Sequence, residues 1–176
     1  MGIATTIRPE ADEFAPYYGT YVGAVPDGDI TRTLAQQGDA FLARLKQLTE
    51  EQAAVAYAPG KWTVKEVVCH ITDAERIFAY RALRIARGDA TPLASFDENA
   101  YAASCGANDR PLESLLDEFA AVRAATLALL RALPEAAWTR RGTASGKEVS
   151  VRGLAWIMTG HAIHHGTVLT DKYGVV

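Results

Sequence analysis

The chain is poor in cysteine and has no long apolar run, and both shortages exclude classes of protein. Two cysteines among 176 residues cannot build a disulfide framework, and Cys69 and Cys105 lack metal-binding or redox spacing. A reducing, cytoplasmic setting is therefore expected. No run of about eighteen apolar residues occurs, and the N-terminal residues lack the charged-then-apolar order of a signal peptide. We expect no membrane as a partner.

The sequence also lacks any basic stretch. With a net charge of −3 and no interleaving of basic and aromatic residues, nucleic acid is not an expected partner. Hydrophobic residues make up 49% of the chain and charged residues 22%, as in ordinary globular proteins. The length predicts a single domain over residues 1–176.

Hydrophobic periodicity predicts an all-α protein. Residues 1–28 are rich in proline, glycine and tyrosine, which predicts an ordered but mostly irregular N-terminal arm, with room for one short helix, whose tyrosines pack onto the body. A first helix is expected from about residue 30 to 48, and a third from Pro111 to Leu133, ended by Pro134. No alternation typical of strands competes with these helices.

The second and fourth helices carry the clearest boundary signals. Thr63 and Glu66 form a T-x-x-E capping box, and Gly88 is a suitable stop for the helix that follows. The fourth helix starts near Ser150. Four amphipathic helices predict a four-helix bundle. The link over residues 89–110 is long for a bundle, so we expect a crossover, a functional loop or an extra turn of helix near residues 97–101.

The four histidines are unevenly placed, and their placement is the main indication of function. His70 lies on the apolar stripe of the second helix, and His161, His164 and His165 lie together on the fourth. Residues 161 and 165 are one helical turn apart and project on the same side. Three buried imidazoles each need a polar partner, and one shared cation would satisfy all three. The pattern predicts a metal site with open coordination positions.

The spacing leaves the third ligand open between two neighbours. His161 pairs with His165 at i,i+4 and with His164 at i,i+3, and both spacings occur in bundle metal sites. The stripe through Leu154 and Met158 favours His165, with His164 as a flanking residue or hydrogen-bond partner. All-nitrogen ligation suits several divalent ions, of which zinc or nickel is expected first, with iron and manganese as alternatives.

Other polar residues near the histidines have plain structural interpretations. Asp73 lies one turn beyond His70 and is a weak candidate for a catalytic base, although a solvated surface carboxylate is the favoured interpretation. Cys69 is expected to pack, because it points about 100° away from His70 on a helix. Asp97 and Glu98 suit either a turn or the mouth of the site. Four charged residues of the second helix are expected to face solvent: Glu75, Arg76, Arg81 and Arg84.

Two segments give the chain a family resemblance. The segment from Trp62 to Ile71 (WTVKEVVCHI) resembles the W-[ST]-x-x-E-x-x-x-H element of the DinB/YfiT superfamily, and the segment from Gly160 to Gly166 (GHAIHHG) resembles its H-x-x-H-H element. Residues 15–30 and 79–99 are also similar to one DinB-like subgroup. The resemblance covers nearly the whole chain.

The resemblance implies a four-helix bundle of crossed connectivity that binds a divalent metal through three histidines. By motif position these are His70, His161 and His165. Relatives include thiol-dependent transferases and isomerases that use bacillithiol or mycothiol, and many of them are dimers. A small-molecule substrate, a low-molecular-weight thiol and a homodimer are therefore expected.

Three hypotheses follow for the function. The first is a metal-dependent thiol S-transferase or hydrolase that acts in detoxification or stress response. The second is a non-catalytic, stress-associated dimer in which the metal clamps the second and fourth helices. The third is a bundle whose core histidines are satisfied without any metal.

Overall fold

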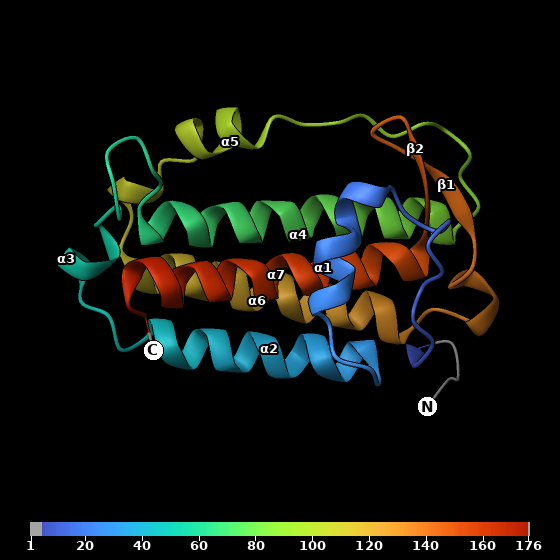
Figure 1. Cartoon of the computed structure of the whole chain (residues 1–176), viewed down its shortest axis with the longest axis horizontal. Coiled ribbons are helices and arrows are strands. Elements are labelled where there is room, and N and C mark those ends of the chain that lie inside the picture. Colours follow the sequence, from blue (N-terminus) through green and yellow to red (C-terminus); the bar gives the residue numbers. More distant parts are fainter. Residues whose placement is uncertain (1–4, 176) are drawn as a thin grey trace.

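A computed structural model describes residues 5–175, and its body is a bundle of four long helices (Figure 1). These helices are α2 (Ile30–Leu45), α4 (Val64–Ala86), α6 (Leu112–Arg131) and α7 (Val151–Tyr173). The predicted all-α bundle is confirmed. The first helix is shorter than expected and ends at Leu45, and Leu48 lies in the turn that follows. No helix within residues 5–175 is long and apolar enough to cross a membrane.

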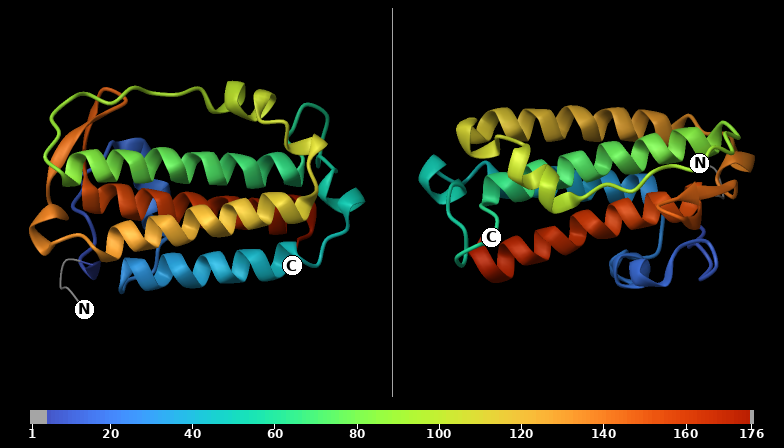
Figure 2. Two further views of the ribbon diagram at one scale, coloured as in Figure 1. Left: turned by 180° about the vertical axis from the view of Figure 1, so that it is seen from behind. Right: turned by 90° about the horizontal axis from the view of Figure 1, so that it is seen from above.

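The order of the helices around the bundle explains the long connection. α4 packs against α6 and α7, and α2 packs against the same two helices from the opposite corner. α4 and α6 run in the same direction, so the chain between them must return along the whole bundle (Figures 1 and 2). Residues 89–110 are this crossover, and they include the expected extra turn as α5 (Glu98–Ser104), followed by the 3-10 turn η3 (Ala107–Asp109). Asp97 caps α5 by accepting from Asn99 N–H and Ala100 N–H.

Side-chain caps fix where the two histidine-bearing helices begin. Thr63 accepts from the Glu66 N–H at 3.1 Å, and Glu66 accepts from the Thr63 N–H at 2.7 Å, so the capping box is complete. Ser150 accepts from the Gly153 N–H at 2.8 Å and starts α7. α4 ends at Ala86, and Gly88 follows in the left-handed conformation, as expected for a stop. A further capping box, on Thr49, starts the unexpected short helix α3 (Glu50–Ala53).

The N-terminal arm is ordered, as expected, and it includes a short helix, which the sequence had left open. It contains the 3-10 turn η2 (Pro16–Tyr18) and the helix α1 (Gly19–Ala24), which packs across α7 (Figure 1). Tyr18 and Tyr21 pack against the core as expected, but Tyr17 is 58% exposed. A side chain at Gly160 would place its Cβ only 2.0 Å from the Tyr21 carbonyl oxygen, so α1 can approach α7 only because residue 160 is glycine. Residues 1–4 of the expected arm lie outside the described residues.

The expectation that no strands form was wrong. Strands β1 (Arg141–Ala144) and β2 (Lys147–Ser150) make an antiparallel hairpin between the 3-10 turn η4 (Glu135–Ala137) and α7. Its two-residue turn has Ser145 and Gly146 at positive φ, a pattern that favours tight hairpins. The strands are short and largely polar, so hydrophobic periodicity carried no signal for them. The crossover pairs with the hairpin through Leu93 N–H and the Thr143 carbonyl at 2.9 Å.

The charged face expected on α4 was also wrong in part. Glu75 and Arg81 are only 2% and 3% exposed, whereas Arg76 and Arg84 do reach solvent in part. Arg81 donates to the Ala94 carbonyl at 2.7 Å and to Ser145 Oγ at 2.9 Å, so it anchors the crossover and the hairpin. Helical periodicity placed both residues outside the apolar stripe of α4, and it could not show that α6 covers Glu75 or that the crossover and the hairpin cover Arg81.

Candidate metal centre

Three histidine rings from two helices converge in the bundle core. The potential ligand nitrogens of His70, His161 and His165 all lie within 4.8 Å of one another. His70 Nε2 and His161 Nε2 are 3.0 Å apart, and the ring of His165 lies 4.7 Å from the His70 ring and 4.5 Å from the His161 ring, centroid to centroid. The structure therefore brings together the three residues that helix phasing selected.

The donor set fits a divalent metal ion. Two nitrogens bound to one zinc at about 2.0–2.1 Å stand roughly 3.0–3.4 Å apart when the angle at the metal is between right and tetrahedral. The 3.0 Å separation of the His70 and His161 nitrogens agrees with that span. Without an ion, a single hydrogen bond would serve only that pair, and within residues 5–175 no hydrogen bond reaches the ring of His165. One cation would serve all three rings.

Burial keeps these imidazoles neutral, which is the form that binds metal. Desolvation lowers the pKa of His70 to about 4. Desolvation, with the neighbouring His70 and His164 rings, lowers the pKa of His165 to about 3. The pKa of His161 is well below its ordinary value for the same reasons. All three rings can thus offer a lone pair at neutral pH without first losing a proton.

Aromatic side chains enclose the cluster on both sides. The Trp62 ring, directly before the capping box, packs against His70 with the ring centroids 4.7 Å apart and the planes tilted by 43°. Tyr21 of α1 meets the edge of His161 at 5.5 Å, and Phe78 of α4 lies 6.0 Å from the same ring. The sequence marked Trp62 only as the first residue of the family motif and gave Tyr21 no role at the site. The T-shaped contact of Tyr21 depends on the tight crossing at Gly160, for which the sequence offered only the glycine itself.

The two weaker candidate residues take different places. His164 is exposed at the rim, 5.1 Å from the His165 ring and 5.3 Å from Tyr21, centroid to centroid. It lies close enough to flank the cluster, and it is not among the three grouped nitrogens. Asp73 instead forms an ion pair with Arg76 at 3.2 Å and is not brought to the histidines.

The two cysteines are neighbours in space but are not poised to act as nucleophiles. Burial, contact with Cys105 and the nearby Asp73 carboxylate raise the pKa of the Cys69 thiol to about 12. Cys69 therefore stays protonated at neutral pH, because both low polarity and a nearby negative charge oppose a thiolate. It lies 3.9 Å from Asp73 Oδ2, and it packs beside the apolar core as expected.

A groove opens from the histidine cluster to the surface. It has a volume of about 290 Å³ and exposes His165 and His164 at one side. Aromatic residues, a lysine and the tip of α5 supply most of the rest: Tyr57, Lys61, Trp62, Asn99 and Tyr173. Asn99 belongs to the crossover and lines the groove, so the crossover reaches the mouth of the site. Asp97 and Glu98, for which the sequence suggested either a turn or this position, directly precede Asn99 in the chain. We name this hollow the Lys61 groove.

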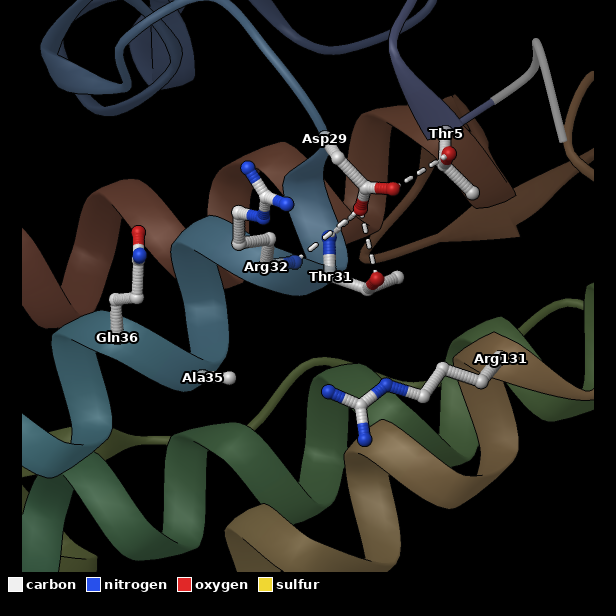
Figure 3. A pocket seen from close by; sticks show the side chains of 7 residues that line it. All are labelled: Thr5, Asp29, Thr31, Arg32, Ala35, Gln36 and Arg131. Atoms are coloured by element: carbon white, nitrogen blue, oxygen red, sulfur yellow. Dashed lines mark hydrogen bonds between the residues drawn. The ribbon is translucent and has the colours of Figure 1, made fainter. Parts of the chain in front are cut away.

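A second hollow, of about 370 Å³, lies away from the histidines between the start of α2 and the end of α6 (Figure 3). Its acidic residue, Asp29, already accepts from Thr5, from Thr31 and from the Arg32 N–H. The guanidinium groups of Arg32 and Arg131 do not converge on a common point (Figure 3). The arrangement is that of a capped helix start rather than a second site.

A bundle with crossed connectivity and an inward three-histidine cluster defines a distinct class of helical proteins. The model of the DinB superfamily matches residues 33–169, and the chain belongs to that family. The curated relative "Putative metal-dependent hydrolase" of Geobacillus thermodenitrificans is 28% identical over 129 residues, which are 72% of each chain.

Solved structures share the fold. YfiT from Bacillus subtilis, described as "a probable metal-dependent hydrolase with an unusual four-helix bundle topology", superimposes with a TM-score of 0.69 at 19% identity, over 97% of this chain and 95% of that one. A mycothiol-dependent maleylpyruvate isomerase gives a TM-score of 0.68 at 16% identity, over 84% of this chain and 60% of the isomerase. At these identities the matches establish the architecture alone.

Proposed function

We propose that this protein is a metal-dependent hydrolase of small molecules, with His70, His161 and His165 as the metal ligands. The observation that carries the proposal is the set of three neutral ring nitrogens within 4.8 Å of one another, beside a groove that reaches the surface. Zinc or nickel suits the all-nitrogen set best, with iron and manganese as alternatives. The names of the curated relative and of YfiT support the same class.

The chemistry follows from the absence of charge on the ligands. His70, His161 and His165 would hold the ion through neutral imidazoles, and the ion would then supply Lewis acidity that brings the pKa of water at the site to about 7. Trp62 would hold the ring of His70 in place by packing against it, and Tyr21 and Phe78 would exclude water from the side of His161. His165 and His164 line the groove from which a substrate would approach.

A thiol-dependent transferase is the second candidate. The neutral donor set leaves a strong Lewis acid that would hold a thiol as thiolate as readily as water as hydroxide. No described residue of the site offers a nucleophile of its own, since Cys69 is held as a neutral thiol and Asp73 is paired with Arg76. The nucleophile in either reaction would therefore enter from solution, and the two candidates differ only in what enters.

Cobalt(II) substitution tests both candidates. The visible bands of Co²⁺ depend on coordination, so azide or a small thiol such as cysteamine should change the spectrum of the loaded protein if a position is free. The same protein should then hydrolyse activated aryl esters or conjugate the thiol to an electrophile, and this separates the two reactions. A spectrum that neither ligand changes would contradict both.

The non-catalytic alternative predicts a different pair of results. If the ion mainly clamps α4 to α7, its removal should lower the melting temperature strongly while no ester or thiol substrate is turned over. We further propose that the chain forms one domain over residues 1–176 and that it is a homodimer in the cytoplasm. Light scattering would measure the oligomeric state, and cell fractionation would check the location. A role in stress response would appear as induction by oxidants or electrophiles.

A further inference from the structure

The Lys61 groove has one wall built by a tight turn. Ala58, Pro59, Gly60 and Lys61 form a turn closed by the Lys61 N–H donating to the Ala58 carbonyl at 3.2 Å. Gly60 has a φ of +74°, as the third position of a type II turn requires, and proline suits the second. A bridge between Ala56 and Thr63 ties both ends of this loop together. Lys61 therefore projects from a fixed point directly before the capped start of α4.

Aromatic rings form the rest of that wall and lead down to the metal ligands. Tyr57 and Tyr173 meet edge to face at 5.1 Å, and the Tyr173 hydroxyl donates to the Trp62 carbonyl at 2.6 Å. The Trp62 ring in turn lies on His70. These contacts hold three flat side chains in place beside His165, which favours a flat apolar body in the groove.

The charge at the rim has no partner within the described structure. Lys61 is exposed, and across residues 5–175 its ammonium group contacts no carboxylate and makes no hydrogen bond. By contrast, Lys65, one turn further on, pairs with Glu50 at 2.6 Å. The nearest acid of the helix start, Glu66, is engaged by the Thr63 N–H and by Asn108 Nδ2 at 3.1 Å. The cation is thus free to bind an anion that enters from solution.

We propose that the Lys61 groove selects small molecules that combine a flat apolar body with an anionic group, and that Lys61 positions the anion while the reacting group faces His165. The inference rests on the proposed metal-dependent function, because the proposed metal site beside His165 fixes where the reacting group of the substrate must lie. Lys61 acts as a positioning residue at the far end of the substrate. Asn99 of α5 supplies the neutral polar contact on the same rim.

Two hydroxamates that differ in a single charge test this inference in the zinc-loaded protein. Benzohydroxamate carries a metal-binding group on a flat ring, and 4-carboxybenzohydroxamate adds a carboxylate at the opposite end. Calorimetry should show the carboxylated probe binding more tightly by up to about fivefold, which is the upper end of the range for one exposed ion pair. Lys61→Met should abolish that preference and leave the dissociation constant of the uncharged probe unchanged.

Lys147→Met is the matched control for Lys61→Met. Lys147→Met removes an equally exposed lysine from β2, outside the groove, and should keep the preference. Equal binding of the two probes to the native protein, or a preference that survives Lys61→Met, would overturn the role of Lys61 while leaving the metal site intact. If neither probe binds the loaded protein, the open coordination position itself is refuted, and the inference falls with it.

Discussion

Two buried polar clusters lie on α4, and they differ in how many of their polar atoms have hydrogen-bond partners within the protein. One joins Glu75 to Arg123 of α6, and the other joins His70 to His161 and His165 of α7. Each places polar groups of two helices in the bundle interior. Burial of this kind is costly unless every polar atom finds a partner. The clusters can therefore be compared by asking which of their polar atoms have a hydrogen-bond partner within the protein.

The Glu75–Arg123 cluster is complete within the protein. Arg123 Nε donates to both Glu75 oxygens at 3.0 Å, and Nη2 donates to Glu75 Oε2 at 2.8 Å. Nη1 donates to the Leu34 carbonyl at 2.6 Å and to Gln37 Oε1 at 2.8 Å. The guanidinium thus ties α2, α4 and α6 together, which is a structural role.

Within residues 5–175, the histidine cluster has one internal hydrogen bond for its three rings. Only the nitrogens of His70 and His161 meet, and the cluster lies beside a groove that opens to solvent. A polar cluster with complete partners stabilises the fold, whereas one with missing partners and an opening is suited to a ligand. We therefore expect substitutions in the Glu75–Arg123 cluster to lower the free energy of unfolding, and substitutions in the histidine cluster to weaken metal binding.

The largest effect is expected from Glu75→Ala. It leaves the Arg123 charge buried without its carboxylate, and breaking a buried pair in this way costs about 3–5 kcal/mol of unfolding free energy. Urea unfolding would measure the loss, and elemental analysis should still find full metal loading. The double substitution Glu75→Leu with Arg123→Met should recover most of the stability. A single variant that unfolds normally but loses its metal would reverse the proposed division of roles.

His161→Ala should have the opposite signature. Removing one of three ligands should weaken metal binding at least about 100-fold, equivalent to roughly 2.7 kcal/mol, as judged by competition with a chelating dye. His164→Ala is the matched control, because its ring lies at the rim, and it should keep the native stoichiometry. Equal bound metal in native protein and His161→Ala would instead support a bundle with no metal.

Gly160→Ala should disturb the cover of the cluster. The added Cβ would lie 2.0 Å from the Tyr21 carbonyl oxygen, so α1 must shift, and such overpacking costs about 1–3 kcal/mol. Thermal unfolding would measure the change, and exchange of the α1 amides should accelerate. Gly166→Ala in the same helix meets only the flexible Arg44 side chain at 3.2 Å and should be close to neutral. Similar losses in both variants would refute the close crossing.

The smallest effect is a pH dependence of the metal-free protein. The folded pKa values of His70 and His165, about 4 and about 3, lie below the ordinary 6.5, so the unfolded chain binds more protons between these limits. Stability should be full above about pH 6.5 and fall as the pH is lowered, by at most about 1.4 kcal/mol per pH unit for each histidine. Denaturant titrations at pH 7.5 and 5.5 would measure the slope, which should become shallower in His165→Gln.

Much of the fold and the candidate site followed from local sequence signals. The capping box at Thr63 and Glu66 set the start of α4 because it needs only neighbouring atoms, and the phase of that helix placed His70 inward. The i,i+4 spacing of His161 and His165 likewise follows from helical geometry alone. The length of residues 89–110 indicated an unusual connection, but it left a crossover, a functional loop and an extra turn of helix as alternatives.

Features that depend on distant segments could not be predicted in this way. The hairpin at residues 141–150 is too short and polar to show a period, and Glu75 with Arg81 are buried only because other segments cover them. Tyr21, Tyr57 and Tyr173 reach the site from both ends of the chain and the α3–α4 loop, so no spacing relates them to the histidines.

The sequence by itself determined the apolar stripe of each long helix, with His70 and His161 on it, and where those helices begin, because caps and periodicity act over a few residues. Only the tertiary structure decided which inward polar groups meet: Glu75 with Arg123, and His70 with His161 and His165. Both outcomes depend on how α4 packs against α6 and α7, a relation between segments far apart in the chain. The groove and its free lysine arise from the same packing, because they exist only where a loop, two helices and the crossover come together.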